Sequence, residues 1–102
     1  MNSSKRPAVS LQNAVEQVPT LARLGQLAAE SAARLRAVQP LLPPGLRELV
    51  RPGPIEEESW CLLVPHNAAA AKLRQLTPAL LASLRAAGYP VGAIRIKVMR
   101  AN

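Results

Sequence analysis

The sequence contains no aspartate and no phenylalanine, and only one cysteine and one histidine. One cysteine permits no internal disulfide and no multi-cysteine zinc site, a usage typical of the reducing cytoplasm. Without aspartate and with one histidine, the chain cannot assemble a Ser-His-Asp triad or a two-histidine metal site. No Walker-type or GxGxxG phosphate loop occurs either. These absences predict a protein that is not an enzyme and that needs no metal or cofactor.

Aromatic residues and long apolar runs are equally scarce. The single tryptophan and single tyrosine exclude a base-stacking platform built from several aromatic side chains. No run approaches the roughly 18 apolar residues of a membrane helix, and the N-terminus lacks the apolar core of a signal peptide. We therefore expect a cytoplasmic protein. Cys61, within an apolar run, is expected to be an inert core thiol, and His66 a loop or capping residue.

The basic charge is concentrated in the second half of the chain. The formal net charge is +7; residues 1–58 hold seven basic and six acidic residues, whereas residues 59–102 hold six basic residues and no acidic one. Such asymmetry indicates an anionic partner, most often nucleic acid. The alternative is a basic surface that is merely solvated.

The first part of the chain predicts an arm followed by one strong helix. Residues 1–18 are polar and basic and are expected to be a flexible arm, in which 10–18 can form a short helix. Thr20 is a suitable N-cap for a helix that continues to Pro40, because apolar residues recur there at alternating spacings of three and four. This periodicity predicts an amphipathic helix packed on its own domain.

Strands are expected on both sides of a second helical region. Residues 46–51 are a weaker strand candidate, which Pro52-Gly53-Pro54 interrupts. Residues 60–64 form an apolar run that stops at a proline, as a buried strand does. Residues 94–98 alternate apolar and basic side chains, which is the period of a half-buried strand.

The helical region between these strands contains a proline. Asn67 is the expected N-cap and Gly88 the expected stop. A proline inside a straight helix removes a hydrogen bond, so two helices are predicted to meet at Thr77-Pro78, with a kinked single helix as the alternative. The resulting order of helix, strand, strand, helix, helix, strand predicts an α+β fold with a small mixed three-stranded sheet and helices on one face. The expected core comprises Leu62, Val64, Leu73, Leu76, Leu80, Leu84, Ile94 and Ile96.

The basic residues of the second half are the candidate nucleic-acid contacts. In a groove between the helices and the last strand they would neutralise phosphates without reading sequence. They are Lys72, Arg74, Arg85, Arg95, Lys97 and Arg100. The alternative interpretation is that their aliphatic stems cover apolar edges of the fold.

Several segments together resemble a known family. The stretches NAAAAKLRQLTPALLASLRAAG and VGAIRIKV, with the earlier step LLPPGL, resemble the signature of the DciA family. The resemblance covers about residues 20–99. It implies a bacterial protein that recruits the replicative DNA helicase or assists its loading, with a DNA-binding folded part similar to a type II KH domain. It assigns residues 19–102 to that KH-like domain, whose order of elements agrees with the order derived above.

The sequence departs from nucleic-acid-binding KH domains at one motif. The slot of their GxxG loop reads Leu76-Thr77-Pro78-Ala79, so side-chain charge rather than a backbone clamp is expected to hold nucleic acid. The expected partners are single-stranded DNA and the replicative helicase, with no membrane and no small-molecule substrate. Because Asn102 closely follows the last strand, helicase contact is expected to use the helix 20–39 or the arm before it. An RNA-binding KH-like adaptor and a purely protein-binding module are the alternative functions.

Overall fold

A computed structural model describes residues 20–100 of the chain. The elements, in chain order, are α2 (Leu21–Val38), the 3-10 helix η1 (Gln39–Leu41), α3 (Pro44–Arg47), β1 (Arg51–Glu56), β2 (Ser59–Val64), α4 (Asn67–Ala86) and β3 (Ala93–Val98). The predicted arm 1–18 and its short helix lie outside the described residues. No helix within the described part is both long enough and apolar enough to cross a membrane.

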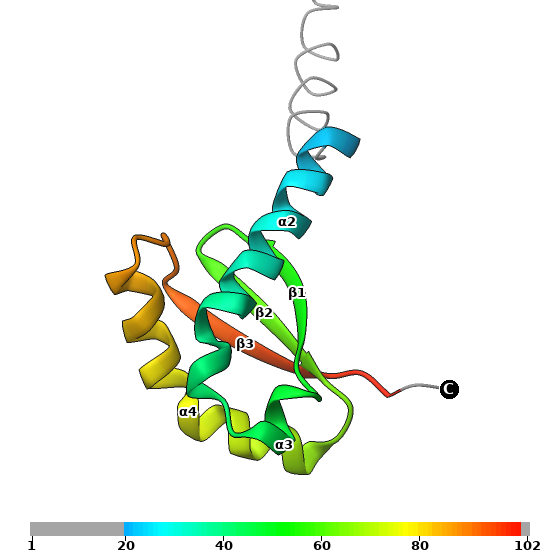
Figure 1. Cartoon of the computed structure of the whole chain (residues 1–102). Coiled ribbons are helices and arrows are strands. Elements are labelled where there is room, and N and C mark those ends of the chain that lie inside the picture. The colour runs from blue at the N-terminus through cyan, green and yellow to red at the C-terminus, as the bar shows by residue number, and fades with distance from the viewer. Residues whose placement is uncertain (1–19, 101–102) are drawn as a thin grey trace, which may run out of the picture.

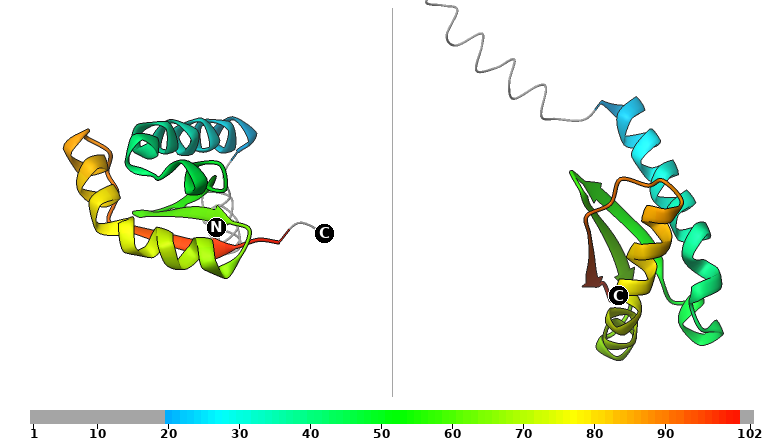
Figure 2. Two further views of the ribbon diagram at one scale, coloured as in Figure 1. Left: turned by 60° about the horizontal axis from the view of Figure 1, so that its bottom comes forward. Right: turned by 90° about the vertical axis from the view of Figure 1, so that its left-hand side faces the viewer.

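The three strands form one mixed sheet. Its order is β1-β2-β3, with β1 antiparallel and β3 parallel to the central strand β2. Both long helices lie on the same face of this sheet, α2 packing on β1 and α4 on β3 (Figures 1 and 2). Helix α4 makes the crossover that two parallel strands require. The predicted α+β fold with a mixed three-stranded sheet is confirmed.

The region around Pro78 differs from the expected pair of helices. Helix α4 runs without interruption from Asn67 to Ala86 with Pro78 inside it, and Figure 2 shows it bending in its yellow part. Pro78 lacks the N–H that a straight helix needs, so a bend is the expected response. The hydroxyl of Thr77 donates instead to the carbonyl of Leu73 at 3.2 Å. The kinked single helix, the alternative at this proline, is therefore the observed arrangement.

Two of the three predicted helix boundaries are confirmed. Thr20 caps α2, since its side-chain oxygen accepts from the N–H of Arg23 at 3.0 Å. Gly88 follows α4 with a φ of 93°, a left-handed conformation that favours glycine. At the start of α4, however, the cap is His66 rather than Asn67. The ring Nδ1 of His66 accepts from the N–H of Ala69 at 3.1 Å, which confirms the capping role expected for this histidine.

The edge strand β1 lies where the sequence predicted a break. Residues 44–47 form the short helix α3 instead of the start of a strand, and β1 runs from Arg51 through Pro52-Gly53-Pro54 to Glu56. Prolines are tolerated there because β1 is an edge strand and its register shifts between Pro52 and Ile55. Gly53 is required by close approach, because a Cβ at this position would lie 2.8 Å from the carbonyl oxygen of Cys61.

A short chain of hydrogen bonds joins α2 to the sheet through Trp60. The indole Nε1 of Trp60, a fully buried residue of β2, donates to the hydroxyl of Ser31 at 2.9 Å. That hydroxyl donates in turn to the carbonyl of Gly53 on β1 at 2.7 Å. The indole N–H of Trp60 and the hydroxyl of Ser31 thus both have hydrogen-bond partners, which avoids the desolvation penalty of an unpaired buried donor.

The same region contains a buried arginine that the sequence analysis did not identify. The side chain of Arg34 is 1% exposed and forms an ion pair with Glu30 one turn earlier in α2. Its guanidinium carbon lies 5.9 Å from the ring centroid of Trp60 and 5.6 Å from that of Tyr89. Two of its nitrogens, Nε and Nη1, have no hydrogen-bond partner. The positive charge of the guanidinium instead interacts with the faces of the two aromatic rings.

The core lies between the helices and the sheet and contains the predicted residues. Leu80 and Leu84 of α4 are fully buried, and the half-buried Ile94 and Ile96 of β3 pack against the same cluster. Helix α2 packs on the domain as its periodicity predicted, with Leu35 and Val38 buried, whereas the buried residues of α3 and the connections were not predicted. The missed residues are Leu42, Leu46, Val50 and Val91.

Replacing Leu80 tests this core. Because Leu80 is 0% exposed, Leu80→Ala should lower the free energy of unfolding by about 2–5 kcal/mol, the range for removing a buried leucine side chain. Urea titration followed by circular dichroism measures the change. Leu21→Ala is the matched control, since Leu21 is 88% exposed and should change stability little. Equal effects of the two substitutions would mean that the buried face of α4 has been assigned incorrectly.

Candidate nucleic-acid interface

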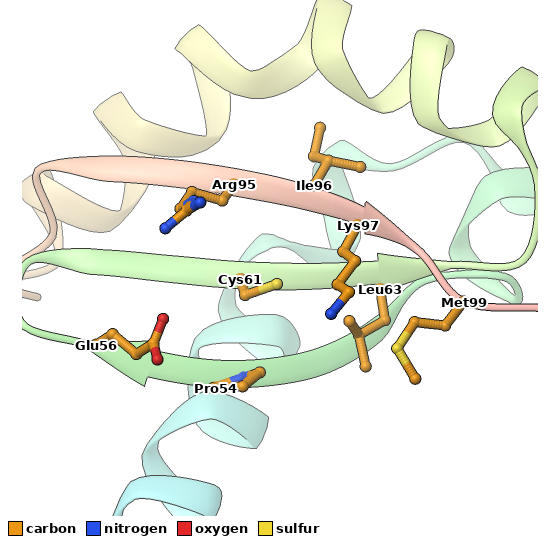
Figure 3. Close-up of a pocket in the computed structure, with 8 residues that line it drawn as sticks. All are labelled: Pro54, Glu56, Cys61, Leu63, Arg95, Ile96, Lys97 and Met99. Carbon is orange, nitrogen blue, oxygen red and sulfur yellow. The ribbon is translucent and has the colours of Figure 1, made fainter.

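The face of the sheet that points away from α2 and α4 is not covered by any described helix. Alternation along β3 directs Ile94 and Ile96 toward the helices and Arg95 and Lys97 to the opposite side, as predicted (Figure 3). The register of the parallel pair places Arg95 beside Cys61 and Lys97 beside Leu63. We refer to this surface as the open sheet face; it consists of Cys61, Leu63, Arg95, Lys97 and Met99.

The open sheet face is hollowed. A recess of about 550 Å³ is lined by its residues together with Pro54, Glu56 and Ile96 (Figure 3). Cys61, Leu63 and Met99 contribute carbon and sulfur atoms to the lining of this recess. Arg95 and Lys97 line it on the side of β3. The recess therefore combines positive charge with apolar area and has no aromatic ring in its lining.

The two cations of this face have no carboxylate partner among the described residues. Arg95 and Lys97 are exposed, and the ion pair found in residues 20–100 joins Arg34 to Glu30 elsewhere in the fold. Glu56 lines the far side of the recess without forming a salt bridge to either cation. Two unpaired cations on one face are suited to binding an anionic ligand.

The structure does not gather all six predicted contacts into one groove. Lys72, Arg74 and Arg85 are exposed on α4, which covers the other face of the sheet. Lys72 borders a recess beside α3, whereas Arg74 lies about 160° from it around the helix axis, by the rotation of 100° per residue of an α-helix. The predicted set is thus divided between the two sides of the sheet, with Arg95 and Lys97 together on the open sheet face.

Arg85 also has a local structural role. Its Nε donates to the carbonyl of Val91 and its Nη2 to the carbonyl of Gly92, both at 3.1 Å. These bonds hold the turn between α4 and β3. This role of Arg85 differs from the alternative given by the sequence, in which the aliphatic stems cover apolar edges, because it is the guanidinium that is engaged.

Two further basic residues lie near the open sheet face. Arg100 is exposed, one residue after Met99. Arg51 pairs with Leu63 in the β1–β2 register, and Arg51, Leu63 and Met99 line a common recess of about 390 Å³. Arg51 was not among the predicted contacts, which were taken from the basic half of the chain, residues 59–102. The face of Arg51 follows from its pairing with Leu63 and not from alternation along β1, because the register shifts between Pro52 and Ile55.

The slot of a GxxG loop has no loop in this structure. Residues 76–79 all lie within the continuous helix α4. Their backbone groups belong to the helix rather than to an exposed turn that could clamp a nucleotide. Among the described residues, any contact to nucleic acid near this slot has to come from side chains, as the sequence analysis expected.

Comparison with protein families identifies this chain. Residues 10–96 match the family described as "Dna[CI] antecedent, DciA". The chain belongs to the DciA family. No curated protein matches it. Membership in the DciA family links the chain to the bacterial replicative helicase and to its loading.

In this DciA-family protein the single cysteine lies on the open sheet face and not in the core. Cys61 is half-buried, because the side chains that face the helices from β2 are its neighbours Trp60 and Leu62. Partial burial raises the pKa of the Cys61 thiol, and the positive charges of Lys97 and Arg95 lower it by a smaller amount. Among residues 20–100, no three histidine, cysteine or acidic side chains come together as a metal site.

The reactivity of Cys61 reports the charge on this face. Arg95→Ala/Lys97→Ala removes two positive charges that stabilise the thiolate, so the pKa of Cys61 should rise further, whereas Glu56→Gln should lower it. The rate of iodoacetamide alkylation measured against pH gives this pKa, and Cys61 is the only cysteine in the chain. Identical pH profiles in all three proteins would show that these charges do not act on the thiol.

Proposed function

We propose that this DciA-family protein is a non-enzymatic accessory protein that binds DNA, preferably single-stranded, through the open sheet face. The observation that carries the proposal is the pair of exposed cations, Arg95 and Lys97, beside an apolar recess. Phosphates bind to the cations, with Arg51 and Arg100 extending the track toward the end of β2. The exposed bases of a single strand then contact Leu63 and Met99, an aliphatic surface that a duplex cannot reach with its stacked bases.

The geometry of β3 supports a single strand as the ligand. Arg95 and Lys97 are two residues apart and on the same side, which separates their Cα atoms by about 7 Å along an extended strand. Such a row suits the successive phosphates of an extended chain. Within the same proposal the domain is KH-like, with α4 replacing the usual helix pair and its loop. The parallel pair β2–β3 and the family membership support this classification.

The salt dependence of DNA binding tests the site. If about four phosphates are neutralised, log K should fall with log salt with a slope near −3 on single strands. Arg95→Ala/Lys97→Ala should flatten that slope by up to about 1.4, because each lost phosphate contact removes about 0.7. Fluorescence anisotropy with a labelled oligonucleotide measures both slope and affinity.

The matched control removes the same charge from the other side of the sheet. Lys72→Ala/Arg74→Ala takes two exposed cations from α4 and should leave the slope nearly unchanged. If the α4 variant has the larger effect, the nucleic-acid site is on the helical side. An RNA oligonucleotide of the same sequence is measured in parallel, and clearly tighter RNA binding would make the protein an RNA-binding adaptor.

We further propose that the replicative helicase docks on the N-terminal half of α2. This half projects beyond the sheet (Figure 1), and it exposes 88% of Leu21 and 48% of Leu24. A groove of about 480 Å³ continues this apolar surface between Leu24, Leu27 and the edge strand β1. Exposed leucines beside an apolar groove are typical of protein-binding surfaces. The site lies within the helix 20–39, one of the two segments that the sequence analysis named for helicase contact.

Polar substitutions on α2 test the helicase site. Leu21→Gln/Leu24→Gln should weaken binding to the purified replicative helicase by about tenfold or more, the effect of losing one or two apolar anchors, and leave DNA affinity within a few-fold. Leu41→Gln, at a leucine of η1 that is 43% exposed, is the control and should bind normally. Surface-immobilised helicase in an interferometry assay gives the affinities. Absence of any helicase binding by the unaltered protein would remove the loader role and leave a plain nucleic-acid-binding protein.

A further inference from the structure

The two edges of the sheet differ in their capacity to accept another strand. The β1 edge carries Pro52 and Pro54 and a shift of register before Ile55, features that block pairing with a further strand. The β3 edge has no proline and keeps an uninterrupted register with β2 over all its residues, from Ala93 to Val98. Of the two edges, only the β3 edge therefore has the regular backbone geometry that an additional strand needs for pairing.

The hydrogen bonds at the two ends of β3 show which backbone groups face outward. The N–H of Ala93 donates to the carbonyl of Glu58, and the N–H of Met99 to the carbonyl of Val64 at 2.8 Å. In a parallel ladder alternate residues direct both backbone groups to the same neighbour. Ala93, Arg95, Lys97 and Met99 thus face β2. The residues that direct N–H and C=O outward are Ile94, Ile96 and Val98.

These outward groups have no partner within residues 20–100. Strand β3 ends the sheet, and no hydrogen bond joins the backbone of Ile94, Ile96 or Val98 to another described segment. Helix α4 packs on the helical side of β3 and runs along the outer edge of this strand (Figure 3). An added strand would therefore find open hydrogen-bonding groups beside it and a helix beneath it.

The charges on β3 determine which strand can pair there. Two copies of β3 paired antiparallel around Ile96 would set Arg95 directly opposite Lys97 of the second copy, and like charges in opposed positions destabilise a pair. An acidic side chain in the same position would be attracted. The surplus of basic over acidic residues in 59–102 strengthens that attraction at longer range.

We propose that the outer edge of β3 accepts an extended peptide of a partner protein as a fourth strand. Acidic residues at alternate positions of that peptide lie beside Arg95 and Lys97 on the open sheet face. Its other side chains lie beside Ile94 and Ile96 and pack toward α4. Main-chain hydrogen bonds supply affinity in this mode of recognition, and the alternate side chains supply specificity. Since DNA would use the same two cations, the peptide and DNA compete for this protein.

Synthetic peptides provide the probes. A capped peptide of alternating valine and glutamate is compared with a matched peptide of alternating valine and lysine, both added to the full-length protein. The glutamate peptide should bind and the lysine peptide should not. Binding should slow amide hydrogen exchange at Ile94, Ile96 and Val98, the outward-facing residues. If the glutamate peptide binds without slowing exchange at these three amides, the association is charge attraction alone and the proposal is wrong.

Two variants separate strand pairing from charge. The glutamate peptide N-methylated at alternate residues keeps its charge but loses donors, and should bind at least about tenfold more weakly. In the protein, Arg95→Glu/Lys97→Glu should reverse the preference toward the lysine peptide by about tenfold, with an unchanged circular dichroism spectrum as the check on folding. Unweakened binding of the methylated peptide, or an unchanged preference in the folded variant, would overturn the proposal.

A competition experiment with an oligonucleotide distinguishes this inference from the proposed function. Single-stranded DNA should compete with the peptide but leave the outward amides of Ile94, Ile96 and Val98 exchanging at their free rates. If DNA slows these amides as much as the peptide does, the β3 edge is a nucleic-acid site and the peptide assignment fails. If the unaltered protein binds DNA but does not bind the glutamate peptide, this inference is wrong and the proposed function stands.

Discussion

The hydrogen-bonded contact between Trp60 and Ser31 determines which face of the sheet becomes the core. Trp60 is the only tryptophan of a chain without phenylalanine, so no other side chain can fill an equal volume. It is fully buried on the central strand and, through Ser31 and the carbonyl of Gly53, joins α2 to both β2 and β1. Arg34 lies over the same ring and over Tyr89, which connects this contact to the turn before β3. These contacts, together with the buried side chains of Leu35 and Val38, hold α2 on the sheet.

Once this face is occupied, strand alternation leaves the cations of β3 on the other face. The residues of β2 that flank Trp60 and Leu62 have to point away from the helices, which places Cys61 and Leu63 on the open sheet face. Parallel pairing then brings Arg95 and Lys97 beside them. The helical side receives the apolar residues of β3 and the open side its cations. The burial of Trp60 on one face of the sheet therefore fixes the positions of both the core and the charged surface.

The signals that could be read from the sequence are local ones. Thr20, Gly88, the run of β2 and the alternation of β3 each act within a few residues, and all are observed as predicted. The features that could not be read depend on distant neighbours. Proline tolerance in β1 follows from its place at the edge of the sheet, and the burial of Arg34 follows from two rings 26 and 55 residues away in the chain. The face of Arg51 is likewise set by its pairing with Leu63.

The arrangement of the three proposed surfaces has a consequence for how they can be used together. Leu24 of α2 shares a groove with residues of the edge strand β1, whereas the open edge lies at β3, with β2 between them. In these proposals a helicase bound at α2 leaves Arg95 and Lys97 accessible, but it comes close to bound DNA, because Pro54, Glu56 and Leu63 line both the groove beside α2 and the recess on the open sheet face. An acidic strand at β3 uses both cations and excludes the phosphates that would bind there. In the proposed arrangement, binding of such a strand weakens DNA binding by competition for two side chains and needs no change in the fold.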